Sequence, residues 1–92
     1  MSQPRPEQYT GTVTAGPGGA MTDDVGVITG DLTLTTTLQT NGQAQIRIQY
    51  TGADEWYTLT GSPTAVPDQD VEALHTAVLD AIARGGEATV PR

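Results

Sequence analysis

The chain has 92 residues, four basic side chains against eleven acidic ones, and a formal net charge of −7. Chains of this length form one small domain. The basic residues are all arginines, Arg5, Arg47, Arg84 and Arg92, and they are too scattered to neutralise a row of phosphates or an anionic membrane surface. We therefore expect neither nucleic acid nor a membrane as a partner.

The sequence contains no cysteine, which excludes disulfides, thiolate catalysis and zinc–thiolate sites. The first residues lack the charged start and apolar stretch of a secretory signal, and no apolar run approaches the roughly 20 residues that span a bilayer. These features predict a cytoplasmic protein. The absence of lysine and phenylalanine beside abundant threonine, glycine and alanine suits a GC-rich bacterial genome.

Residues 1–29 contain early prolines, a glycine-rich cluster at 16–19 and few large apolar side chains. This composition predicts a largely flexible N-terminal segment. Within it, residues 9–14 and 25–29 have strand-like composition. The alternative prediction is therefore that this segment adds a short strand or an irregular hairpin.

The clearest strand patterns lie in residues 31–39 and 44–51, where apolar and polar side chains alternate. Asn41 and Gly42 between them indicate a hairpin. A two-residue turn would mix apolar and polar side chains on both faces, whereas a three-residue loop at 40–42 keeps the apolar ones together. That loop places these pairs opposite one another: Leu38 and Ala44, Thr36 and Ile46, Leu34 and Ile48, and Leu32 and Tyr50.

Residues 56–60 form the third predicted strand, after a four-residue loop that pairs Tyr50 with Tyr57 and Ile48 with Leu59. The sheet is then a three-stranded antiparallel meander. In this register Trp56 points away from the core, and a bulge of one residue would exchange it with Tyr57. Both placements remain open at this point.

A helix is predicted from an N-cap at Asp68 to about Arg84, where Gly85 follows. Its apolar stripe has the spacing of an amphipathic helix and would cover one face of the sheet; it consists of Val71, Leu74, Val78 and Ile82. The predicted fold is α+β in the order β-β-β-α, with one domain at residues 30–86. Residues 87–92 are expected to be a frayed tail, or at best a short extra edge segment.

The sequence offers no catalytic constellation. His75 is the single histidine and has no nucleophile motif to serve, so it is expected to be a packing histidine on the helix. The acidic run at 68–72 lacks the central glycine of a calcium loop and is better explained as a helix start. We expect no enzyme activity, no cofactor and no metal site.

The sheet face turned away from the helix is the most informative surface. It is flat, nearly uncharged and built from short side chains, so a contact with it costs little side-chain entropy. Tryptophan and arginine are also the residues that most often anchor interfaces. The residues we expect to bind a partner are Thr33, Thr35, Thr37, Gln45, Arg47, Gln49, Trp56 and Thr58.

The strand at 31–39 has an edge without lysine or proline, which predicts that something covers it. The candidates are residues 25–29, a second copy of the chain or a partner strand, and the small core also favours a homodimer. We expect a non-catalytic interaction module that binds another protein or itself. The alternative is an acidic inhibitor or nucleic-acid mimic that occupies a basic site on another protein, because the net charge is −7.

Overall fold

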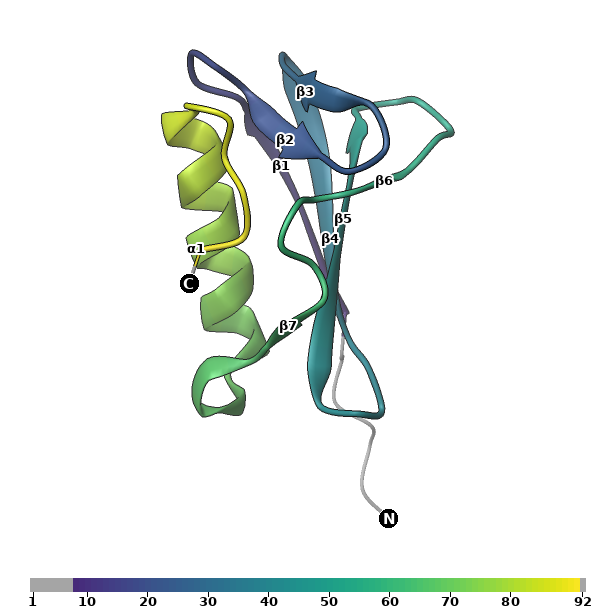
Figure 1. The fold of residues 1–92 in the computed structure, drawn as a ribbon, viewed down its shortest axis with the longest axis vertical. Helices are drawn as coiled ribbons and strands as arrows, with labels where there is room; N and C mark the ends of the chain where they lie inside the picture. The colour runs from purple at the N-terminus through teal and green to yellow at the C-terminus, as the bar shows by residue number, and fades with distance from the viewer. Residues whose placement is uncertain (1–7, 92) are drawn as a thin grey trace.

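A computed structural model describes residues 8–91, which form a sheet with one helix on one of its faces (Figure 1). In chain order the elements are β1 (Gln8–Thr14), β2 (Ala20–Thr22), β3 (Gly26–Ile28), β4 (Asp31–Leu38), β5 (Gln43–Tyr50), β6 (Tyr57–Thr58), β7 (Thr64–Ala65), the 3-10 turn η1 (Pro67–Gln69) and α1 (Val71–Arg84). The α+β class with an antiparallel sheet and one C-terminal helix is confirmed, but the sheet has more strands than the three expected.

The β4–β5 hairpin has the predicted register. Leu38 lies opposite Ala44 and Leu32 opposite Tyr50, so the apolar side chains share one face. The turn holds Gly42 at a φ of 87°, and the Gln39 N–H donates to the Gln43 carbonyl at 2.7 Å. Glycine suits this bulge because an L side chain is strained at positive φ.

The third predicted strand is shorter than expected, and its register is different. β6 places Ile48 opposite Tyr57 instead of Leu59, a shift of two residues that leaves each side chain on its predicted face. The chain leaves β5 after Leu59, whose N–H still donates to the Ile46 carbonyl at 3.1 Å, and β7 rejoins the same strand at Gln43 and Ala44. The Ser62 hydroxyl accepts a hydrogen bond at 2.7 Å from the Ile46 N–H, which replaces a strand-to-strand bond at this gap.

The N-terminal segment differs most from expectation. Within residues 8–29, which we expected to be largely flexible, the chain forms β1, β2 and β3, so the alternative of added strands is the closer description. Residues 9–14 lie in β1 and residues 26–28 form β3, but these strands pair with β4 and β2 rather than with each other. β1 pairs with β4 along its full length, from Gln8 opposite Thr37 to Thr14 opposite Asp31. This strand covers the β4 edge, so neither residues 25–29 nor a second copy is needed there. Residues 1–7 lie outside the described part of the chain.

The β2–β3 hairpin packs beside the β6 region. The Thr60 N–H donates to the Met21 carbonyl at 3.0 Å, and Thr22 and Leu59 form an isolated bridge. These contacts supply main-chain partners to Leu59 and Thr60, at the point where the chain separates from β5. It explains why the predicted strand at 56–60 is cut short.

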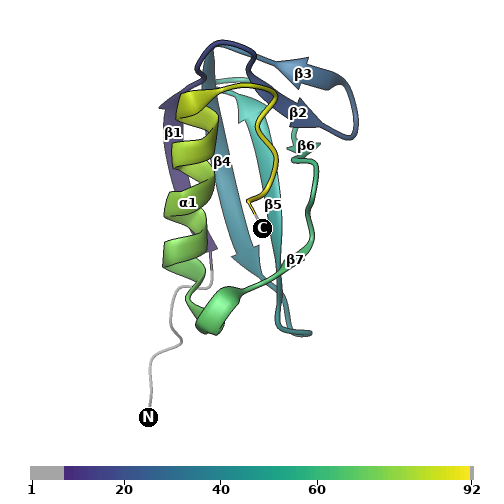
Figure 2. The same ribbon diagram turned by 60° about the vertical axis from the view of Figure 1, so that its left-hand side comes forward.

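The helix α1 covers the face of β1 and β4 (Figure 2). It begins two residues later than the N-cap at Asp68 would place it, because Asp70 is the cap and accepts a hydrogen bond from the Ala73 N–H at 3.0 Å. Asp68 lies instead in η1 with a φ of 54°. The predicted buried stripe is confirmed at Val71, Leu74, Val78 and Ile82. Within residues 8–91, no helix is long and apolar enough to cross a membrane.

The C-terminal residues differ from the expected frayed tail. Ala88 and Val90 are buried in the core, which also includes Ala20 and Ile28 from outside the range 30–86. The Ala88 N–H donates to the Gly19 carbonyl and the Val90 N–H to the Thr60 carbonyl, each at 2.9 Å. The alternative of a short extra edge segment is the closer description.

Candidate binding surface

The face of the sheet turned away from α1, hereafter the outer face, is built from alternate residues of its long strands. Leu32 and Leu34 of β4 are buried under α1, so Thr33, Thr35 and Thr37 point the other way. The strands align these side chains in rows. The central row contains Thr10, Thr35, Arg47 and Thr58 from β1, β4, β5 and β6.

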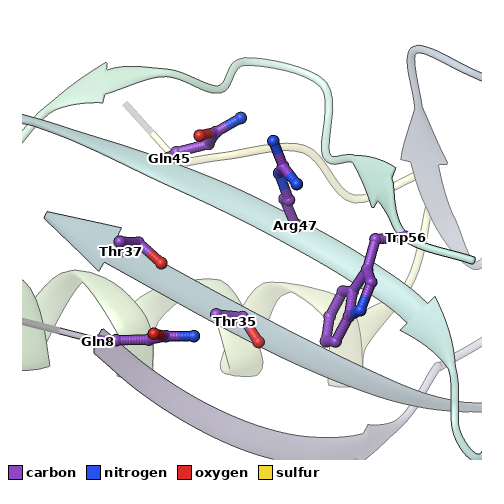
Figure 3. Close-up of a pocket in the computed structure, with 6 residues that line it drawn as sticks. All are labelled: Gln8, Thr35, Thr37, Gln45, Arg47 and Trp56. Carbon is purple, nitrogen blue, oxygen red and sulfur yellow. The ribbon is translucent and has the colours of Figure 1, made fainter. Parts of the chain in front are cut away.

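A shallow depression of about 410 Å³ lies on the outer face. It is lined by Gln8, Thr35, Thr37, Gln45, Arg47 and Trp56 (Figure 3). Five of these six residues are among those predicted from the sequence to bind a partner. The lining contains the Arg47 guanidinium and no carboxylate, although the chain as a whole carries a net charge of −7.

Trp56 stands at one end of the depression, immediately before β6. Its side chain is 38% exposed, whereas Thr35 beside it is only 9% exposed. Figure 3 shows the indole lying over the sheet next to Thr35. A tryptophan held in this way offers a partner a large flat apolar surface and one N–H donor.

Arg47 projects from the middle of β5 and is exposed. With the Gln45 amide oriented so that its oxygen faces the guanidinium, this oxygen accepts from Arg47 Nη2 at 3.1 Å and from Nε at 3.2 Å. The neutral amide positions the guanidinium without neutralising its charge. The fork of donors therefore keeps its attraction for an anionic or carbonyl group on a partner.

The other predicted residues, Thr33, Gln49 and Thr58, do not line the depression. Gln49 donates from Nε2 to the Ala53 carbonyl at 2.8 Å, and Thr33 shares a hydrogen bond of 3.0 Å with Thr51. These side chains stabilise the neighbouring loop and turn. Thr58 lies opposite Arg47 in the central row.

The structure also distinguishes Trp56 from Tyr57. Tyr57 packs against the core, edge-on to Tyr50 with ring centroids 6.4 Å apart. Its hydroxyl donates to Glu55 Oε1 at 2.8 Å, and this hydrogen bond raises the pKa of the Tyr57 hydroxyl. Trp56 is therefore left on the outer face, as in the register without a bulge.

Sequence reasoning missed the contribution of β1 to the outer face. Gln8 lines the depression, and Thr10 extends the central row, yet both belong to the segment expected to be flexible. The alternation of Thr10, Thr12 and Thr14 was the available signal. It was weak because few large apolar residues mark the other side of this strand.

His75 lies on the opposite side of the sheet from the depression. It is 6% exposed, its Nδ1 is 2.9 Å from Thr36 Oγ1, and its ring centroid is 5.8 Å from that of Tyr9. Burial lowers the pKa of His75. These contacts make it a packing residue of the layer between α1 and the sheet.

The acidic pair in the β2–β3 turn is used within the fold. Asp24 accepts from the Thr58 N–H at 2.7 Å, and Asp23 accepts from the Thr60 hydroxyl at 2.8 Å. Within residues 8–91, no group of three or more histidine, aspartate or glutamate side chains is placed to hold a metal ion. In comparisons with family models, curated proteins and solved structures, no match to this chain was found.

Proposed function

We propose that this chain is a non-catalytic interaction module that binds a protein partner through the outer face. One observation carries the proposal. The aromatic side chain Trp56 and the cationic side chain Arg47 flank a depression without a carboxylate, in a chain of net charge −7. A group that the acidic chain would otherwise repel can approach this part of the surface.

The chemistry of the lining supports a protein partner. Trp56 offers area for a flat or aliphatic side chain, and Arg47 offers a fork of donors for a carboxylate or a main-chain carbonyl. Thr35 and Thr37 are short and β-branched, so little rotamer entropy is lost when a partner covers them. Tryptophan and arginine are enriched among residues that dominate binding energy.

The acidic-mimic function has weaker support. A mimic needs carboxylates that project freely, but half of the ten acidic side chains within residues 8–91 accept hydrogen bonds inside the chain, namely Asp23, Asp24, Asp31, Glu55 and Asp70. The experiment described below distinguishes this function from binding through the outer face. Binding through carboxylates weakens strongly with salt, whereas binding anchored on one tryptophan and one arginine is much less sensitive.

The test compares what the full chain retains from an extract of the cells that produce it. Four proteins are immobilised: the parent chain, Trp56→Ala, Arg47→Ala and the control Thr89→Ala, whose side chain is exposed and outside the depression. Circular dichroism first checks that all four are folded. We expect the same proteins on the parent and the control, and at least about a tenfold lower amount of one of them on each test variant.

Equal retention by all four proteins would overturn the proposal. Retention that is lost at high salt and is unchanged by Trp56→Ala would favour the acidic-mimic function instead. A partner that tolerates salt and depends on both Trp56 and Arg47 supports the outer face as the binding surface.

A further inference from the structure

The open edge of β1 carries a second inference, which does not depend on the outer face. Among residues 8–91, β1 is the terminal strand of the sheet and has one neighbour, β4. The Thr51 N–H donates to the Asp31 carbonyl at 3.0 Å. Because main-chain groups along an antiparallel strand alternate between its two neighbours, the odd-numbered residues of β4 form their main-chain hydrogen bonds with β5 and the even-numbered residues form theirs with β1. Their partners in β1 are Tyr9, Gly11 and Val13.

The main-chain groups of the intervening residues in β1 therefore point away from the sheet. These residues are Gln8, Thr10, Thr12 and Thr14. Together they form a row of N–H and C=O groups over a strand of seven residues. Such a row is a template for another strand unless charge, proline or a bulge protects it.

None of these protective devices is present in β1. Its sequence, QYTGTVT, has no charged residue and no proline, and each of its residues from Gln8 to Thr14 is paired with β4 without a bulge. In a chain of net charge −7 this is a neutral border along which two acidic molecules can approach each other.

We propose that two copies of the chain pair through β1, antiparallel about a two-fold axis at Gly11. In this register all seven residues of the strand are paired. The outward-pointing groups of Thr10 bond to the partner's Thr12, and those of Gln8 bond to the partner's Thr14. On the face under α1, Tyr9 lies opposite the partner's Val13, which is a favourable aromatic and β-branched pair.

The helix position fits the same axis. α1 packs on β1 and β4, and Leu79 lies so close to Gly11 that a Cβ there would be 3.1 Å from Leu79 Cδ1. Two helices, each centred between β1 and β4, would lie about two strand spacings apart, or about 10 Å. The axes of packed helices lie roughly 8–10 Å apart, so this spacing is at the upper end of that range.

The residues beside the edge are also incompletely covered in one molecule. Tyr9 and Val13 of β1 and Leu79 of α1, which packs against β1, are half-buried. Thr76 and Ala83 lie on the same flank of α1 as Leu79 by helical spacing, and both are exposed. Pairing of a second copy would cover this flank and would continue the outer face across both molecules.

The test combines solution mass with amide hydrogen exchange on the full chain. Light scattering over a wide concentration range is expected to show a mass that doubles as the concentration rises. In high salt the mass should double at a lower concentration, because salt screens the repulsion between two chains of net charge −7. In the doubled species the amides of Thr10 and Thr12 are expected to exchange at least about tenfold more slowly than in the dilute protein. Gly11 and Val13, which bond to β4 in both states, are the internal controls.

The variant Thr12→Pro removes an edge N–H that β4 does not use, and it is expected to abolish the doubled mass. Because proline can also disturb the strand, the exchange data on the parent chain test the inference without it. A single-chain mass at every concentration overturns the inference. So does a doubled mass with unchanged exchange at Thr10 and Thr12, and loss of doubling in Trp56→Ala would assign the contact to the outer face instead.

Discussion

The Nδ1 atom of His75 lies 2.9 Å from the hydroxyl oxygen of Thr36, in the buried layer between α1 and β4. Thr36 is fully buried and His75 nearly so. A threonine on the apolar face of β4 thus has a hydrogen-bond partner, and so does the buried histidine of α1. The pair joins the helix to the sheet through polar atoms that would otherwise be costly to bury.

This relationship predicts a pH dependence of stability. Burial lowers the pKa of His75 below its ordinary value of 6.5 in the folded chain. The unfolded chain therefore binds a proton at a pH where the folded chain does not, and stability falls as the pH decreases below about 6.5. Urea unfolding at about pH 7.5 and pH 5.5 measures the difference.

The matched variant His75→Gln keeps a polar group near Thr36 but does not titrate. It is expected to lose less stability than the parent chain over the same interval. An equal loss in both proteins would assign the pH dependence to the carboxylates rather than to His75.

Gly11→Ala tests the contact between β1 and α1. A Cβ at Gly11 would lie 3.1 Å from Leu79 Cδ1 and 3.2 Å from His75 Nε2. We expect a decrease of about 1–3 kcal/mol in the free energy of unfolding, because the side chains of Leu79 and His75 must shift within a packed layer to make room. Thr10→Ala, on the exposed side of the same strand, is the control. A gain in stability, which glycine-to-alanine changes in open strands usually give, would contradict the close contact.

Ser62→Ala tests the gap between β6 and β7. The serine hydroxyl is the acceptor for the Ile46 N–H, and Ile46 is fully buried. Its removal leaves a buried donor unsatisfied, so we expect a loss of about 1–3 kcal/mol in chemical denaturation. Thr40→Ala at the exposed hairpin turn should change stability by less than about 0.5 kcal/mol. Similar values for the two variants would show that the serine bond contributes little.

Val90→Ala tests whether the C-terminal segment is part of the core. Val90 is 2% exposed, and its loss of two carbon atoms is expected to cost about 2 kcal/mol. The adjacent exposed residue provides the control Thr89→Ala, which should be nearly neutral. Thermal unfolding at matched protein concentration measures both. A neutral Val90→Ala would be the behaviour of a frayed tail.

The hairpin of β4 and β5 could be predicted from sequence because the signal is local and redundant. Strict alternation fixes which side chains face inward and selects the loop length that keeps Leu38 opposite Ala44, and Gly42 supplies the positive φ that this loop needs. The helix could also be predicted from sequence, because its apolar stripe has helical spacing. Its N-cap was misplaced because Asp68 and Asp70 are both good capping residues, and the local turn at η1 decides between them.

The remaining elements depend on contacts between distant segments. β1 is a strand because β4 offers an edge about twenty residues later, whereas its own residues include Gly11 and small threonines. Val90 is buried because Thr60 and Gly61 lie beside it, which no local pattern reveals. The candidate site follows the same division. Arg47 and Gln45 could be placed from the hairpin, but Gln8 could not.

The outer face is tested most directly at its tryptophan. Trp56 is the single tryptophan of the chain, so incorporation of fluorotryptophan gives one fluorine NMR signal that reports on the depression alone. We predict that a protein retained in the capture experiment shifts or broadens this signal, and that Arg47→Ala weakens the effect. Binding that is evident in solution mass but leaves the Trp56 signal unchanged would contradict the account.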